Sequence, residues 1–176
     1  MIETDRLILR PPDDPDREAL AAMNADPRVA EWLSGPLTRQ ESDALVDRIR
    51  TEIGLNGWGF WAVERKADRA VIGLTGLLAM PDSLPPGPAV EIGWRLSPAA
   101  WGSGYATEAA RAALAWGFEH IRPPEIIAIT ARTNLRSQAV MRKIGMVPDP
   151  ARDFEHPKLA QDHPLRPHVT FVATPP

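Results

Sequence analysis

Two glycines separated by one residue, Gly102 and Gly104, stand between a strand-like run at residues 89–97 and an alanine-rich helical run at residues 107–119. Glycines leave the backbone accessible, and the start of a helix directs free N–H groups and the positive end of its dipole at the same point. Strand, glycine turn and helix start together are typical of a site that holds a pyrophosphate through main-chain amides. The same glycines are also compatible with a simple tight turn.

A second group of polar residues follows the next buried strand. Residues 126–133 are β-branched and apolar on both faces, which is typical of a central strand covered on two sides. Asn134 directly follows and is positioned to cap a helix over residues 135–144, which Gly145 closes. Asn134 is therefore a candidate helix cap.

These residues require a framework of alternating strands and helices. Side chains in residues 89–97 alternate between two faces, with Val90, Ile92, Trp94 and Leu96 on one and Glu91, Gly93 and Arg95 on the other. Thr38 and Glu41 form a capping-box signal for a helix that ends at Gly57, and its apolar stripe is Leu45, Ile49 and Ile53. We expect strands at 6–10, 58–65, 70–80, 89–97, 126–133, 146–154 and 168–173, and helices at 17–24, 38–55, 107–119 and 135–144. This order predicts a mixed α/β fold.

Composition limits the class of protein. A chain of 176 residues with 44% apolar residues can bury a sizeable core, and without a long linker or repeat we expect one domain over residues 1–176. A net charge of −3 gives no basic surface for nucleic acid. The absence of cysteine excludes thiolate catalysis, and no close histidine spacing indicates a metal, so we expect none. Residues 1–6 lack a signal-peptide pattern, and the apolar run at 71–80 is shorter than the roughly 20 residues of a membrane span. We expect a cytoplasmic protein without a membrane partner.

Four motifs in order resemble the GNAT superfamily of N-acetyltransferases, in its RimJ/RimL-like branch. The superfamily signature Gln/Arg-x-x-Gly-x-Gly/Ala falls on residues 101–106, with Trp101 in place of Gln or Arg and with Gly104 and Ala106 matching. Asn134 to Ser137 followed by Lys143 to Met146 is similar to Asn-x-x-Ser … Lys-x-Gly-Phe, with Met146 in place of Phe. The opening at residues 4–10, the sequence Ile92-Gly93-Trp94 and residues 101–109 also resemble that branch, whose members include many bacterial proteins. The resemblance covers essentially the whole chain.

The resemblance implies the GNAT fold, in which a mixed, mostly antiparallel sheet is splayed between its fourth and fifth strands and is flanked by four helices. Here those strands are residues 89–97 and 126–133. Acetyl-CoA, the co-substrate, would lie in that cleft, with its pyrophosphate on the amides of residues 102–107 and its pantetheine pairing with the fourth strand. The implied cofactor-binding residues are Ile92, Gly93, Trp94, Trp101, Gly102, Ser103, Gly104, Tyr105, Ala106, Thr107, Asn134, Ser137 and Lys143.

The implied reaction is transfer of an acetyl group to a primary amine by direct attack. A lysine-like amine titrates near 10.4 and an N-terminal amine near 8, so either must lose a proton at neutral pH, and a general base is expected. Glu91 is the candidate, because a cleft would desolvate its carboxylate and raise its pKa; the alternative is a solvated strand carboxylate. The tyrosine that usually protonates the leaving thiolate is absent, with Met141 near its place, and the one tyrosine is Tyr105. Ser137 is the candidate donor; alternatively the thiolate leaves unaided.

Several other side chains have two interpretations. Trp58, Phe60 and Trp61 form either an aromatic wall of the acceptor pocket or part of the core. His168 is either an acceptor-site group or a structural histidine. Arg136 and Arg142 either pair with CoA phosphates or lie on a solvated helix face.

The resulting hypothesis is an acetyl-CoA-dependent N-acetyltransferase, monomeric or homodimeric, whose acceptor is a protein N-terminus or a small-molecule amine. A non-catalytic acyl-CoA-binding or regulatory domain with the same fold is the alternative. A nucleotide-binding protein is a third possibility, but no Walker Gly-Lys-Ser/Thr motif is present.

Overall fold

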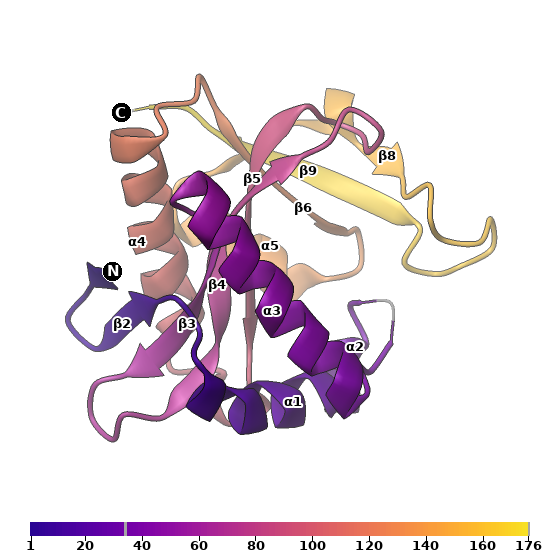
Figure 1. Cartoon of the computed structure of the whole chain (residues 1–176). Helices are drawn as coiled ribbons and strands as arrows, with labels where there is room; N and C mark the ends of the chain where they lie inside the picture. The colour runs from indigo at the N-terminus through magenta and orange to yellow at the C-terminus, as the bar shows by residue number, and fades with distance from the viewer. Residues whose placement is uncertain (34, 176) are drawn as a thin grey trace.

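The computed structural model describes residues 1–33 and 35–175, and its centre is an open sheet with helices on both faces (Figure 1). The sheet order is β1-β2-β3-β4-β5-β6-β9-β7, and β8 pairs with β9. All neighbouring pairs are antiparallel except β5–β6, which is parallel. The strands are β1 (Ile2–Glu3), β2 (Leu7–Arg10), β3 (Phe60–Arg65), β4 (Val71–Met80), β5 (Ala89–Leu96), β6 (Ile126–Ala131), β7 (Val147–Pro148), β8 (Phe154–Glu155) and β9 (Pro167–Ala173). The α-helices are α1 (Arg17–Ala25), α2 (Pro27–Ala30), α3 (Arg39–Asn56), α4 (Tyr105–His120) and α5 (Leu135–Lys143).

The predicted mixed, mostly antiparallel sheet is confirmed, and the four predicted helices correspond to α1, α3, α4 and α5. The sequence interpretation missed β1 and the single turn of α2, which are too short to show a periodic pattern. The strand predicted at 146–154 was wrong as one continuous element. Pro150 begins a 3₁₀ turn that separates β7 from β8, because proline has no N–H to donate to a sheet ladder.

Local sequence signals explain where the long helices begin and end. The Thr38 side chain accepts from the Glu41 N–H, and the Glu41 carboxylate accepts from the Thr38 N–H at 2.8 Å, so the predicted capping box is present. At its other end α3 ends at Gly57, whose φ of 77° is in the left-handed region that favours glycine. Asn134 caps α5 by accepting from the Ser137 N–H.

The two faces of the sheet are covered by different helices, as Figure 1 shows. On one face α4 and α5 pack over the largest core cluster, which includes Ala113, Met141 and Phe171. On the other face α1, α2 and α3 pack over Leu74 of β4. In α3 the buried apolar positions are Val46 and Ile49, whereas Leu45 and Ile53 of the predicted stripe are half-buried at its edge. Side chains of β5 therefore have different neighbours depending on which face of the sheet they point to.

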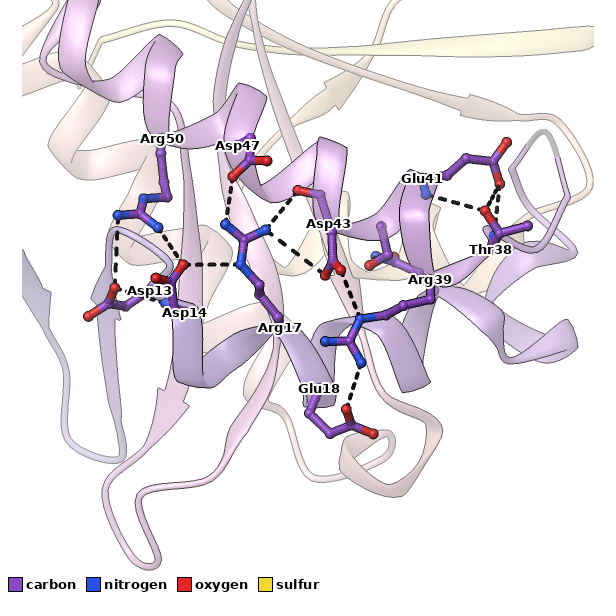
Figure 2. A network of polar contacts seen from close by, with 12 residues as sticks. Asp13, Asp14, Arg17, Glu18, Thr38, Arg39, Glu41, Asp43, Asp47 and Arg50 are labelled. Atoms are coloured by element: carbon purple, nitrogen blue, oxygen red, sulfur yellow. Dashed lines mark hydrogen bonds and ion pairs between the residues drawn. The ribbon is translucent and has the colours of Figure 1, made fainter.

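Ion pairs join α1 to α3 along the outside of this second face (Figure 2). Arg17 lies at their centre, with Nη2 at 2.6 Å from Asp47 and Nε at 3.1 Å from Asp14. Arg39 joins Glu18 to Asp43 in the same network. These ion pairs therefore connect the two helices along their exposed sides.

Two glycines of β4 allow neighbouring strands to approach closely. A Cβ at Gly76 would lie 2.2 Å from the Gly59 carbonyl oxygen, and one at Gly73 would lie 2.3 Å from the Arg95 carbonyl oxygen. The strands therefore lie in close backbone contact at these glycines, and the register shifts in the facing strand between Val63 and Glu64. Among the described residues, no helix is both long enough and apolar enough to cross a membrane.

Candidate active site

The two parallel strands at the centre of the sheet separate after a short paired segment. β5 and β6 pair only at Val90–Ile126 and Glu91–Ile127. Beyond that point, residues 92–96 pair with β4 on one side, and β6 pairs with β9 along its whole length. The edges that β5 and β6 turn toward each other are thus unpaired, and each carries backbone groups that need a partner. A wedge opens between the carboxyl ends of the two strands, which confirms the predicted splay.

The glycine turn lies at the wide end of this wedge. Gly102 and Gly104 have φ of 76° and 80°, and α4 begins directly after them. Within the described part of the chain, the backbone N–H groups of residues 102–107 donate to no protein acceptor; the first donor after Trp101 is Glu108, to the Gly104 carbonyl. Six consecutive free amides at the start of a 16-residue helix form a concentrated donor site for an anion.

Side chains from the beginning of the chain hold this turn in place. Arg6 donates from Nη1 to the Ser103 carbonyl at 2.9 Å and from Nε to the Glu108 carboxylate at 2.6 Å. Thr4 donates to the same carboxylate at 2.6 Å. The sequence interpretation noted both segments as motifs but missed that they contact each other across about a hundred residues.

Asn134 and Ser137 stand at the carboxyl end of β6, on the other side of the wide end. The Asn134 side chain accepts from the Ser137 N–H at 3.1 Å and donates to Thr130 Oγ1 at 3.1 Å. Asn134 is buried and Ser137 is half-buried. The cap interpretation of Asn134 is therefore correct, and the cap fixes the first turn of α5, which carries Ser137, at the carboxyl end of β6.

A contact across the wide end joins these two sides. The Arg136 guanidinium lies 5.0 Å from the centre of the Trp101 ring, and Trp101 Nε1 donates to the Leu96 carbonyl at 2.8 Å. Lys143 is different, because it is exposed at the far end of α5, where its carbonyl accepts from Arg111. The structure therefore brings together the predicted cofactor residues at positions 92–94, 101–107, 134 and 137, but places Lys143 away from them.

Glu91 lies at the narrow end, where the pairing of β5 and β6 stops. Its register neighbours are Leu78 of β4 and Ile127 of β6, which are both apolar. Burial raises the pKa of Glu91 to about 7, well above its usual value near 4.5. Its side chain shares a face with Gly93, above which the Phe60 ring lies so close that a Cβ would be 2.8 Å from it. A carboxylate with this pKa can accept a proton at neutral pH.

Arg95 lies on the same face of β5, toward the wide end. Its Nη1 donates to Asn24 Oδ1 of α1 at 2.7 Å, and Asn24 Nδ2 donates to Ser42 Oγ of α3 at 2.9 Å. Burial lowers the pKa of Arg95. The sequence interpretation placed Arg95 on this face but gave it no role, because its partners come from helices distant in sequence.

Tyr105 points away from the wedge. The Arg6 guanidinium lies 4.6 Å from its ring centre and that of Arg65 lies 6.0 Å from it. Met141, near the place of the family's usual acid, is buried in the core. Of the candidates considered, Ser137 is the hydroxyl that stands at the wedge.

The aromatic segment of β3 divides between core and surface. Trp61 is buried and packs edge-on against Trp116 at 5.1 Å between ring centres, so it belongs to the core rather than to an acceptor wall. Phe60 is half-buried on the Glu91 face, and Trp58 is half-buried against the main core.

The remaining candidates lie near β9. His168 packs against His156 and Phe154, with ring centres 4.9 and 5.4 Å apart, and burial lowers the pKa of both histidines. Arg142 lies 5.1 Å from the Phe171 ring centre and contacts neither the turn nor the wedge. His168 is thus a packed histidine that stays neutral at pH 7, about one strand length from Glu91.

An open sheet whose two central parallel strands separate toward a glycine turn defines the N-acetyltransferase class of acyltransferases. The sequence matches the family model described as an acetyltransferase (GNAT) domain over residues 6–147. The chain therefore belongs to the GNAT acetyltransferase family.

Individual relatives agree with this assignment. An uncharacterised N-acetyltransferase of Bacillus subtilis, YnaD, is 30% identical over 82% of this chain and 81% of its own length. The crystal structure of a GNAT-family acetyltransferase from Bacillus anthracis superposes with a TM-score of 0.81 at 24% identity, covering 98% of this chain and 97% of that one. A spermidine N-acetyltransferase from Vibrio cholerae, solved in complex with CoA and spermine, has a TM-score of 0.76 at 17% identity over 97% of this chain and 96% of its own.

Proposed function

We propose that this acyltransferase takes its acetyl group from acetyl-CoA and transfers it to a primary amine by direct attack. The observation that carries the proposal is the row of six free amides at residues 102–107, placed at the wide end of a wedge with unpaired strand edges. The amides fit a pyrophosphate, and the free edge of residues 92–96 fits the amide groups of a pantetheine arm. A structural neighbour of the same fold is solved with CoA, which supports this choice of donor.

The residues of the chain then have distinct roles. Acetyl-CoA supplies a thioester carbonyl that is open to attack by a neutral amine. Glu91 accepts the proton that the amine must lose, since a pKa of about 7 makes its carboxylate a stronger base than usual and still leaves about half of it ionised at pH 7. Ser137 stands at the wedge and donates a proton or orders a water toward the leaving sulfur. Asn134 holds Ser137 in position through the cap of α5.

Calorimetry with acetyl-CoA, followed by thiol release against a panel of primary amines, tests the proposal. Binding with turnover on at least one amine is the expected result. Binding without turnover on any amine would favour the regulatory alternative, and absence of binding would overturn the cofactor assignment. Arg111→Gln, on the opposite face of the molecule's central sheet from Glu91, is the control and should match the wild type in both measurements.

A further inference from the structure

The guanidinium of Arg95 is a desolvated cation without a counter-ion among residues 1–33 and 35–175. Its one hydrogen bond there goes to the neutral amide of Asn24, through Nη1. Arg10, which is also largely buried, lies 2.7 Å from both Asp16 and Glu64. A cation that is taken out of water without a carboxylate partner is unfavourable, and an incoming anion would relieve that cost.

The geometry of the guanidinium defines what would bind. With Nη1 engaged by Asn24, the Nε–Nη2 edge remains, and this edge matches the two oxygens of a carboxylate. Neither Nε nor Nη2 of Arg95 is among the fully buried side-chain atoms of the described chain that lack a hydrogen-bond partner, so neither nitrogen is sealed in the interior. Asn24 holds the Arg95 guanidinium in one orientation, and Asn24 is itself held by its hydrogen bond to Ser42.

Arg95 and Glu91 share one face of the same strand. Four residues of extended chain separate their Cα atoms by about 13 Å. The residue between them on this face is Gly93. It has no side chain, so the Phe60 ring lies directly over the backbone of the strand there. α4 covers the other face of the sheet. Arg95 and Glu91 therefore lie across the sheet from the helix whose free amides fit the phosphates of acetyl-CoA.

We propose that the acceptor is an elongated primary amine that carries a carboxylate, which binds Arg95 while the amine lies at Glu91. This inference rests on the proposed function and names its substrate class. A short α-amino carboxylate such as glycine cannot span the two groups, whereas a chain of about six bonds or more can. Two kinds of molecule carry a primary amine and a distant carboxylate: a free amino acid with a distal amine, and a peptide with a free N-terminus and an acidic side chain.

Matched pairs of acceptors test the proposal. If the acceptor is a free amino acid, we expect kcat/KM to be higher for 6-aminohexanoate than for hexylamine or glycine. If it is a peptide N-terminus, we expect kcat/KM to be higher for Gly-Gly-Glu amide than for Gly-Gly-Gln amide. The comparison that shows the preference identifies the source of the acceptor. Arg95→Gln should lower the acid-to-neutral ratio of kcat/KM by about 10- to 100-fold, the usual range for a hydrogen-bonded charged group. Arg95→Lys should recover part of the ratio because it keeps the charge but loses the fork. Arg111→Gln should leave it unchanged.

A second variant keeps the test valid where Arg95→Gln does not fold. Asn24→Asp would place a carboxylate 2.7 Å from Arg95 Nη1 and so supply the missing counter-ion at constant volume. We expect the acid-to-neutral ratio to collapse in this variant although Arg95 is intact. An equal loss for acidic and neutral acceptors, or the absence of any preference in the wild type, would overturn the proposal.

Product binding separates failure of this inference from failure of the proposed function. Calorimetry of N-acetyl-6-aminohexanoate and N-acetylhexylamine against the protein with CoA needs no turnover. Tighter binding of the acid that is lost in Arg95→Gln supports the anion site even where no amine is acetylated. Equal binding of the two compounds would contradict it.

Discussion

At the scale of single residues, Glu91 shows how burial raises the basicity of a carboxylate at the expense of stability. The pKa of Glu91 is raised from about 4.5 to about 7 because its neighbours on both adjacent strands are apolar. If Glu91 is the base, turnover rises with pH and has an inflection near 7. In Glu91→Gln that inflection disappears and turnover falls by roughly 10²–10⁴-fold, while the affinity for acetyl-CoA is nearly unchanged. A pH profile of kcat with saturating amine, beside calorimetry, checks this; full activity of the variant would remove Glu91 as base.

The same shift has a consequence for stability with a definite sign. The folded-state pKa lies above the unfolded one, so the stabilisation from Glu91 is present in full below about pH 4.5 and is lost as the pH rises through about 7. Glu91→Gln should therefore raise the free energy of unfolding at pH 8 by at most roughly 3 kcal/mol and change it little near pH 4.5. Urea unfolding at the two pH values measures the difference.

Gly104 combines a backbone requirement with a ligand requirement. Its φ of 80° disfavours any side chain, and a Cβ there would lie 3.4 Å from Arg6 Nη2, which braces the turn. Gly104→Val should lower the affinity for acetyl-CoA at least roughly tenfold, because it displaces the free amides. Gly57→Val is the matched control, with a φ of 77° and nothing within 4 Å of its Cβ. Both should lose stability, but unchanged affinity in Gly104→Val would refute the phosphate-turn assignment.

At the scale of elements, the ion-pair network of Figure 2 attaches α3 to α1. Arg17 is mostly buried by its surroundings and lies 2.6 Å from Asp47, whereas Arg28 is 68% exposed and pairs with its near neighbour Asp26. Arg17→Gln should lower the free energy of unfolding at low salt and lower it by less in 1 M NaCl. Arg28→Gln should have almost no effect. Urea unfolding at the two salt concentrations checks both, and equal losses in both salts would indicate packing rather than charge.

Sequence signals predicted the elements well where the signal was local. The Thr38–Glu41 capping box, Gly57 and the Asn134 cap each depend on residues within a few positions, and each is present. What the sequence could not supply depends on distant segments. The brace of Arg6 on Ser103 and the Arg95–Asn24 bond join positions about 70 to 100 apart, and nothing in the spacing of the residues indicates either. The interrupted strand after α5 combines both kinds of cause, because Pro150 breaks the strand locally whereas the register of β7 and β8 is set by their distant partner β9.

At the scale of the whole molecule, the sheet is held at both ends and open in the middle. β6 is paired to β9 at six positions and β5 to β4 at eight, but β5 and β6 share only two. The antiparallel ladders keep the two halves rigid, while the wedge between them depends on Trp101 and Arg136 at its wide end. A ligand that pairs with the open edges therefore completes the sheet across the molecule.

Hydrogen exchange tests this view of the wedge directly. We expect acetyl-CoA to slow exchange in residues 92–96 of β5 and in the amides of residues 102–107, because both gain hydrogen-bond partners that they lack in the free protein. The β3–β4 ladder is already paired and serves as the internal control. At a ligand concentration of 100 Kd, mass action adds about 2.7 kcal/mol to the free energy of unfolding, so Tm should rise by roughly 5–10 °C. Protection at residues 102–107 without protection at 92–96 would show that the ligand is held by its phosphates alone and that the sheet stays open.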